Sequence, residues 1–183
     1  MLELTHGFNT VLTKIELLLF KLKEKTARNA LEVNLKLLQR RFYNLSNYYY
    51  LSNKRASLRL VPLNDVIEKV NSLCKSVKLN SKIQEEVTMS VDQEVFILAL
   101  QELNIFESLF GGGSAHVDFT KVKDGIVVNV IDISNIVDLT DEKDLMEEQK
   151  LRWDNILKAF QLSGGKVLKS VDKSKVKYQF KIS

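Results

Sequence analysis

The sequence has few of the residues that interrupt or cross-link a chain. Its 183 residues include one proline, seven glycines and one cysteine. So few prolines and glycines argue against a collagen-like or turn-rich all-β chain and favour long helices with short loops. The single cysteine, Cys74, cannot form an internal disulfide, so we expect a protein of the reducing cytoplasm.

The sequence also lacks a long apolar run and a strong excess of one charge. Its run IELLLFKL, residues 15–22, is far shorter than the roughly 20 residues that cross a membrane. The chain opens without the basic segment and small-residue cleavage site of a secretory leader, and we expect no membrane association. The net charge of +4 is spread along the chain, which does not favour nucleic acid as a partner.

Apolar residues in the first third recur at alternating spacings of four and three, the pattern of an amphipathic helix. Two such stripes flank the polar stretch KEKTARN: Phe8, Leu12, Ile15, Leu19 and Leu22, then Leu31, Leu35, Leu38, Phe42, Leu45 and Tyr49. They predict an antiparallel helical hairpin over residues 1–56. One hairpin has a thin core, so we expect a homodimer in which two hairpins form a four-helix bundle. Packing of the hairpin on its own chain's second domain is the alternative.

Residues 52–63 (SNKRASLRLVPL) mark a domain boundary, because they are basic and polar and their proline disfavours continued helix. Beyond it the chain alternates between strand-like and helix-like patterns. We expect strands at 57–63 and 85–91, helices at 64–79, 92–110 and 151–164, and hairpins at 114–133 and 166–182. Asn64 or Asp65 should cap the first of these helices, and Gly164 and Gly165 should end the last. The chain is therefore predicted to be an α+β protein, a helical hairpin followed by an α/β sandwich with helices on one face of a mixed sheet.

Residues 6–15 read HGFNTVLTKI, a histidine followed by an apolar residue, a threonine and a Leu-Thr-x-Ile ending. This stretch resembles the phosphoacceptor box of bacterial sensor histidine kinases, and the order of elements resembles that family's catalytic core over nearly the whole chain. The resemblance implies a dimerisation and phosphotransfer domain at residues 1–56, with His6 as phosphoacceptor, and an ATPase-like domain at residues 57–183. It also places Thr10 at the position that assists phosphatase activity. The acidic residue that follows the family's histidine is replaced by Gly7, which cannot act as a base.

The helical pattern itself gives His6 a position suited to this chemistry. His6 lies two residues before Phe8, a member of the apolar stripe, and is therefore expected on the outward face of the helix. A neutral imidazole there can attack a phosphoryl group. The alternative interpretation is that His6 is a solvent-exposed histidine without a functional role.

The resemblance also implies a nucleotide site, and here the sequence departs from the family. Asn104 stands where an asparagine helps to hold magnesium, but the family's other asparagine, one helical turn earlier, is replaced by Leu100, which cannot ligate the ion. Asp132 matches the aspartate that binds adenine, but both glycines that should follow it are absent. The family's glycine-rich phosphate-binding segment corresponds to residues 138–157, which contain no glycine and many carboxylates. We expect Asn104 and Asp132 to be remnants, with no cofactor and no metal.

The leading hypothesis is a dimeric histidine phosphotransfer protein that passes a phosphoryl group to or from response-regulator receiver domains through His6, with Thr10 assisting and without ATP. Its partner-binding residues would lie around the histidine and on a basic part of the second helix: Phe8, Asn9, Thr13, Arg40 and Arg41. The two arginines alternatively keep the bundle soluble. The second hypothesis is a non-catalytic binding module that modulates a response regulator or kinase and does not need His6. A kinase with an unusual ATP site, dependent on Asn104 and Asp132, is the third.

Overall fold

A computed structural model describes residues 2–21, 24–73, 78–81, 83, 86–111, 116–131, 147–172 and 175–182. The chain divides into two compact units, Met1–Asn53 and Lys54–Ser183. Each unit has its own secondary structure and core. Over the described residues, no helix combines the length and apolar character needed to cross a membrane.

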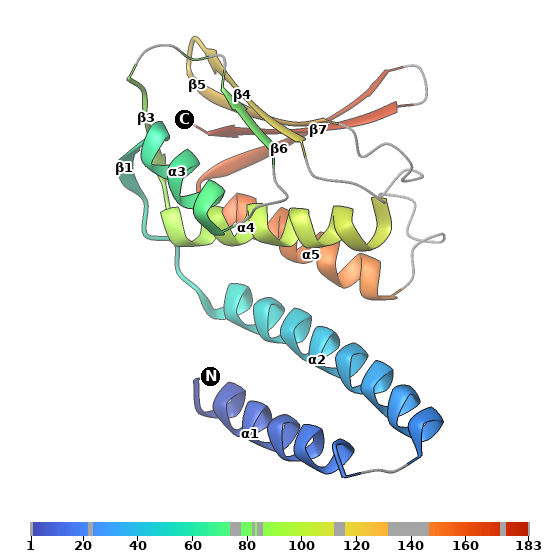
Figure 1. The fold of residues 1–183 in the computed structure, drawn as a ribbon. Helices are drawn as coiled ribbons and strands as arrows, with labels where there is room; N and C mark the ends of the chain where they lie inside the picture. The colour runs from blue at the N-terminus through green and yellow to red at the C-terminus, as the bar shows by residue number, and fades with distance from the viewer. Residues whose placement is uncertain are drawn as a thin grey trace. The chain divides into compact units, whose positions relative to one another are not determined.

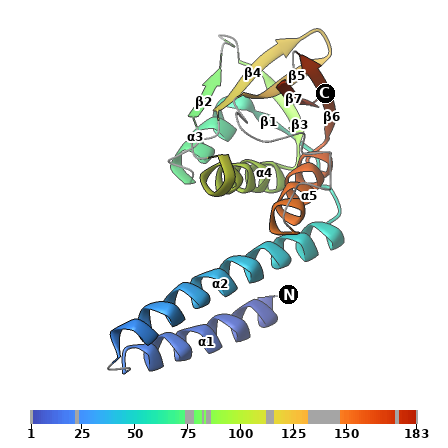
Figure 2. The same cartoon turned by 90° about the vertical axis from the view of Figure 1, so that its right-hand side faces the viewer.

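The first unit is an antiparallel helical hairpin. Helix α1 spans Leu2–Leu19 and helix α2 spans Lys25–Asn53, and the two run side by side in both views (Figure 1, Figure 2). Two contacts fix their opposite directions. The rings of Phe8 and Phe42 stack with centroids 3.6 Å apart, and Gln39 Nε2 donates a hydrogen bond to Glu16 Oε1 at 3.0 Å. The predicted helical hairpin is thus confirmed.

The core of the hairpin uses only part of the predicted apolar stripes. Leu12, Leu19 and Leu35 are buried together, and Phe8 packs against them. The remaining described members of the two stripes are exposed or only partly buried: Ile15, Leu31, Leu38, Phe42, Leu45 and Tyr49. The thin core expected for a single hairpin is therefore what the unit has.

The second unit contains two sheets among its described residues. Strands β1 (Arg59–Pro62) and β3 (Thr88–Val91) form an antiparallel pair. The larger sheet has the order β2-β4-β5-β7-β6, with β2 parallel to β4 and the other neighbours antiparallel. Its strands are β2 (Lys78–Ser81), β4 (His116–Val122), β5 (Gly125–Ile131), β6 (Gly165–Asp172) and β7 (Lys175–Ile182). The sheet is mixed, as predicted.

Helices α3 (Leu63–Leu73), α4 (Gln93–Phe106) and α5 (Glu147–Leu162) lie on one face of the large sheet (Figure 1). A π-helical turn, Glu107–Gly111, continues α4. The core between helices and sheet contains an aromatic row in which Phe160 stacks on Phe180 at 3.7 Å and meets Phe96 edge-on at 5.7 Å. The predicted arrangement of helices on one sheet face is confirmed.

Two details at α3 correct the expectations from sequence. The helix begins at Leu63, whose amide donates a 2.9 Å hydrogen bond to the carbonyl of Val87, so Asn64 and Asp65 lie inside the first turn and neither is the cap. The helix ends at Leu73 rather than near residue 79. Lys78 and Leu79 instead belong to β2, because pairing with β4 satisfies their backbone groups at the sheet edge.

Candidate functional site

Helix α1 carries the predicted phosphoacceptor. Its span of Leu2–Leu19 includes the backbone of His6, while the side chains of His6 and Asn9 lie outside what the structure describes. Each residue turns an α-helix by about 100°, so position 6 is roughly 200° around the axis from Phe8. Since Phe8 packs into the hairpin core, position 6 falls on the opposite side of α1.

The same helix groups other predicted residues on one stripe. Thr10 and Thr13 follow position 6 at spacings of four and three, which places them along one helix face, and both are exposed. Phe8 is separated from this stripe, because it is half-buried on Phe42. The described structure therefore gives Phe8 a packing contact and gives Thr10 and Thr13 exposed positions.

Arg40 and Arg41 lie on α2 between the two contacts that align the helices. Phe42 meets Phe8, and Gln39 meets Glu16, so the two arginines are level with the middle of α1. Arg41 is exposed and Arg40 is half-buried. The antiparallel hairpin thus brings these arginines to the same height along the hairpin as Thr10 and Thr13.

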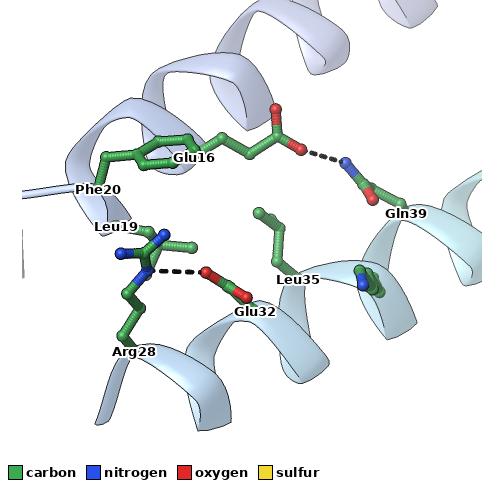
Figure 3. Close-up of a pocket in the computed structure, with 8 residues that line it drawn as sticks. Glu16, Leu19, Phe20, Arg28, Glu32, Leu35 and Gln39 are labelled. Atoms are coloured by element: carbon green, nitrogen blue, oxygen red, sulfur yellow. Dashed lines mark hydrogen bonds and ion pairs between the residues drawn. The ribbon is translucent and has the colours of Figure 1, made fainter. Parts of the chain in front are cut away.

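A groove of about 490 Å³ lies between α1 and α2 near their connection (Figure 3). Its apolar floor includes Leu19 and Leu35, and the Arg28 guanidinium stands 4.9 Å from the centre of the Phe20 ring at its edge. Arg28 also donates to Glu32 at 2.9 Å. The groove starts at Glu16, ten positions from His6, or about 15 Å along the helix, so it is separate from the predicted phosphoacceptor.

In the second unit, Asn104, predicted to be a remnant of the family's magnesium site, is half-buried on α4. The side-chain oxygen of Asn104 is buried and has no hydrogen-bond partner among the described residues. Leu100, one turn earlier, is fully buried in the core. Asp132 lies outside the described residues. In the part of the chain that the structure describes, no group of three or more histidine, cysteine, aspartate or glutamate side chains could hold a metal ion.

A buried ion pair joins α4 to α5, and the sequence patterns did not predict it. Arg152 Nη1 lies 2.7 Å from Glu102 Oε2, and both side chains are 0% exposed. Glu148, four residues before Arg152 on α5, approaches Arg152 Nη2 at 3.9 Å. The sequence does contain one signal for this pair. Glu102 is spaced by three or four residues from its neighbours on the buried stripe of α4, which consists of Val95, Ala99 and Phe106. A charged residue on such a stripe requires a partner.

No family model and no curated protein matches the chain. Solved structures do. Histidine kinase AdeS of Acinetobacter baumannii matches with a TM-score of 0.63 and 16% identity, over 95% of this chain and 93% of that one. Histidine kinase ThkA, solved in complex with the response regulator protein TrrA, matches with a TM-score of 0.59 and 16% identity over 98% of this chain and 59% of that one.

Full-length ShkA, solved in complex with AMPPNP, matches with a TM-score of 0.59 and 13% identity over 99% of this chain and 45% of that one. The chain therefore spans about half the length of these longer proteins. At such identities the likeness concerns the fold, and it includes both the hairpin and the sandwich because nearly the whole chain is covered. The chain has the fold of the histidine kinase catalytic core.

Proposed function

We propose that this chain is a histidine phosphotransfer protein of a two-component phosphorelay. His6 would exchange a phosphoryl group with the phosphorylated aspartate of a receiver domain. In the forward step the P–O bond to the aspartate breaks and a P–N bond to the imidazole forms, which releases the free carboxylate. The reverse step passes the group to another receiver.

One observation carries the proposal: the histidine-containing box lies on the first helix of a hairpin whose fold, together with the sandwich, matches histidine kinases. One of those kinases, ThkA, is solved with a response regulator. The receiver domain is therefore the partner class that we propose for this chain. Thr10, which follows His6 by one helical turn, would help to position the reacting groups, and Phe8, Asn9, Thr13, Arg40 and Arg41 would form the contact region.

We further propose that the active form is a homodimer. Exposed apolar residues continue along both helices outside the hairpin core: Val11, Ile15 and Leu18 on α1, and Leu31, Leu38 and Leu45 on α2. The three α2 residues recur every seven positions, the spacing of a helix-bundle seam. A second hairpin that covers this face would complete a four-helix bundle.

The test is transfer of labelled phosphate. Candidate receiver domains are charged with labelled phosphate and mixed with the wild-type chain, with His6→Ala, and with His116→Ala as the matched control. His116 is the chain's second histidine and lies on β4. We expect an acid-labile, base-stable label on the wild type and on His116→Ala, and none on His6→Ala.

The other outcomes are equally informative. Label that persists on His6→Ala would show that another residue is the phosphoacceptor. Receiver binding without any transfer would reject phosphotransfer and support a non-catalytic module that modulates a response regulator or kinase.

A further inference from the structure

The fold implies a site for a nucleoside triphosphate and magnesium, between α4 and the start of α5. One described feature fits such a site, the buried Asn104 oxygen without a hydrogen-bond partner among the described residues. The rest do not. Leu100 is buried in the core, and α5 opens with Glu147 and Glu148 where phosphate oxygens would need donors. Carboxylates repel a triphosphate, so the residues present do not fit the nucleotide.

One basic side chain on this part of α5, that of Arg152, already has carboxylate partners. Arg152 contacts Glu102 at 2.7 Å and Glu148 at 3.9 Å, and its side chain is 0% exposed. Two carboxylates thus lie within 4 Å of one guanidinium. Arg152 Nε and Nη2 have no hydrogen-bond partner among the described residues, but they are buried, so a phosphate could reach them only by opening the α4–α5 interface and disturbing the pair with Glu102.

The ion pair is enclosed along the helix interface. On one side, Phe106 of α4 packs against Trp153 of α5 at 5.6 Å, and on the other, Phe96 of α4 meets Phe160 of α5 at 5.7 Å. Both side chains of the pair are 0% exposed, so water does not reach it from the surface. Because charges separate at great cost in a dry interface, the pair and its aromatic neighbours hold α4 and α5 in one arrangement.

We infer that the second unit does not take up a nucleotide between α4 and α5, and that the buried Arg152–Glu102 pair joins these helices without a ligand, so that the unit is assembled in one ligand-independent state. The unit then acts as a permanent scaffold rather than as a domain that closes on ATP. This inference rests on the α4–α5 interface and is independent of phosphotransfer by His6.

The first experiment measures ligand dependence on the full chain. Thermal unfolding is followed by Trp153 fluorescence with increasing MgATP or MgADP up to millimolar concentrations, beside calorimetric titration. The chain has one tryptophan, which lies in α5, so the signal reports on this unit. We expect an unchanged melting temperature and no saturable heat. A nucleotide present at a hundred times its dissociation constant would raise the melting temperature by roughly 5 °C or more, and such a rise would overturn the inference.

The second experiment is a double-mutant cycle on the same signal. Glu102→Gln removes the carboxylate 2.7 Å from the buried guanidinium and leaves only Glu148 at 3.9 Å, so it should lower the melting temperature by roughly 10 °C or more. The double variant Glu102→Leu with Arg152→Met replaces the pair by apolar side chains. Measured beside the single variants Glu102→Leu and Arg152→Met, it completes the cycle and should recover most of their loss. The matched control is the exposed pair Lys181–Asp124 of the same unit, with N–O at 3.8 Å, where Asp124→Asn should shift unfolding by less than about 2 °C.

Strong coupling between positions 102 and 152 supports the inference. Additive losses, or a Glu102→Gln variant as stable as the exposed control, would overturn it. If Glu102→Gln does not fold, the double variant decides alone: recovery of the wild-type melting temperature within a few degrees supports the inference, and failure to fold overturns it. Nucleotide binding would refute this inference while leaving the His6 transfer assay unaffected.

Discussion

Gly164 and Gly165 connect α5 to β6, and the geometry at each explains the choice of glycine. Gly164 has a φ of +93°, where a side chain is strained, and a Cβ there would lie 3.1 Å from both Leu58 Cδ2 and the carbonyl oxygen of Ser90. A Cβ on Gly165 would lie 2.8 Å from the carbonyl oxygen of Phe160, a backbone atom that cannot move aside. The helix therefore ends where the chain must turn tightly into the sheet.

We predict that Gly165→Ala destabilises the second unit by about 2 kcal/mol or more, because the clash is with backbone. Urea unfolding followed by Trp153 fluorescence gives the free energy of unfolding. Gln161→Ala, at an exposed position of the same helix end, is the control and should change it by less than about 0.5 kcal/mol. Equal stability of the two variants would contradict the packing described for Gly165.

At the residue scale, sequence reasoning found local signals and missed distant ones. The end of α5 at Gly164 and Gly165 was predictable, because a glycine pair after an apolar helical pattern is a local stop signal. The Arg152–Glu102 pair joins residues 50 positions apart, and no local pattern encodes such a contact. The cap of α3 was predicted wrongly because polar residues in a first turn resemble caps in sequence.

Helices α1 and α2 of the hairpin leave many of their apolar residues exposed within one chain. Leu12, Leu19 and Leu35 are buried, whereas Leu38 and Leu45, on the same predicted stripe as Leu35, are 47% and 54% exposed. A monomer that keeps such a seam in water loses the free energy of its burial. This is the element on which the proposed dimer depends.

We predict that Leu38→Glu weakens dimerisation by roughly a hundredfold or more, since each dimer would bury two carboxylates at the seam. Sedimentation or light scattering across a concentration series measures the mass and the dissociation constant. Val33→Glu is the control, because Val33 is 67% exposed and lies off the seven-residue repeat. A wild-type chain that remains monomeric at high concentration, or equal weakening by both variants, would reject the seam as the interface.

The elements themselves were largely predictable, since their existence follows from periodicity. Long helices and the two C-terminal hairpins carry strong repeats. Strand β2 was read as the end of a helix because its four residues are too few to show alternation, and it exists through pairing with β4. Of the candidate site, helix α1 and the stripe of Thr10 and Thr13 follow from the same periodicity, while the role of His6 remains a prediction.

For the whole molecule, the two units Met1–Asn53 and Lys54–Ser183 differ in what stabilises them. The hairpin has a thin core and, in the proposed dimer, depends on a second copy. The sandwich has an extensive core of its own, with Phe96, Phe160 and Phe180 at its centre. The two units should therefore respond differently to protein concentration.

We predict two unfolding transitions with different concentration dependence. Trp153 fluorescence, which reports on the sandwich, should give the same midpoint at all protein concentrations. The helical signal at 222 nm should contain an additional transition that gains about 2.7 kcal/mol for a hundredfold rise in concentration, as a dimer requires. If the fluorescence and helical signals changed at the same midpoint, and that midpoint did not depend on protein concentration, the units would unfold together and no dimer would contribute.

The buried Arg152–Glu102 pair also has a consequence for how this sequence can change over generations. A substitution at either position alone leaves a charge stranded inside the protein, so each single step out of the present state passes through a poorly folded intermediate. A change to a nucleotide-binding interface would need both positions, and the acidic start of α5, to change together. Selection for a folded protein should therefore keep both residues of the pair once they are present.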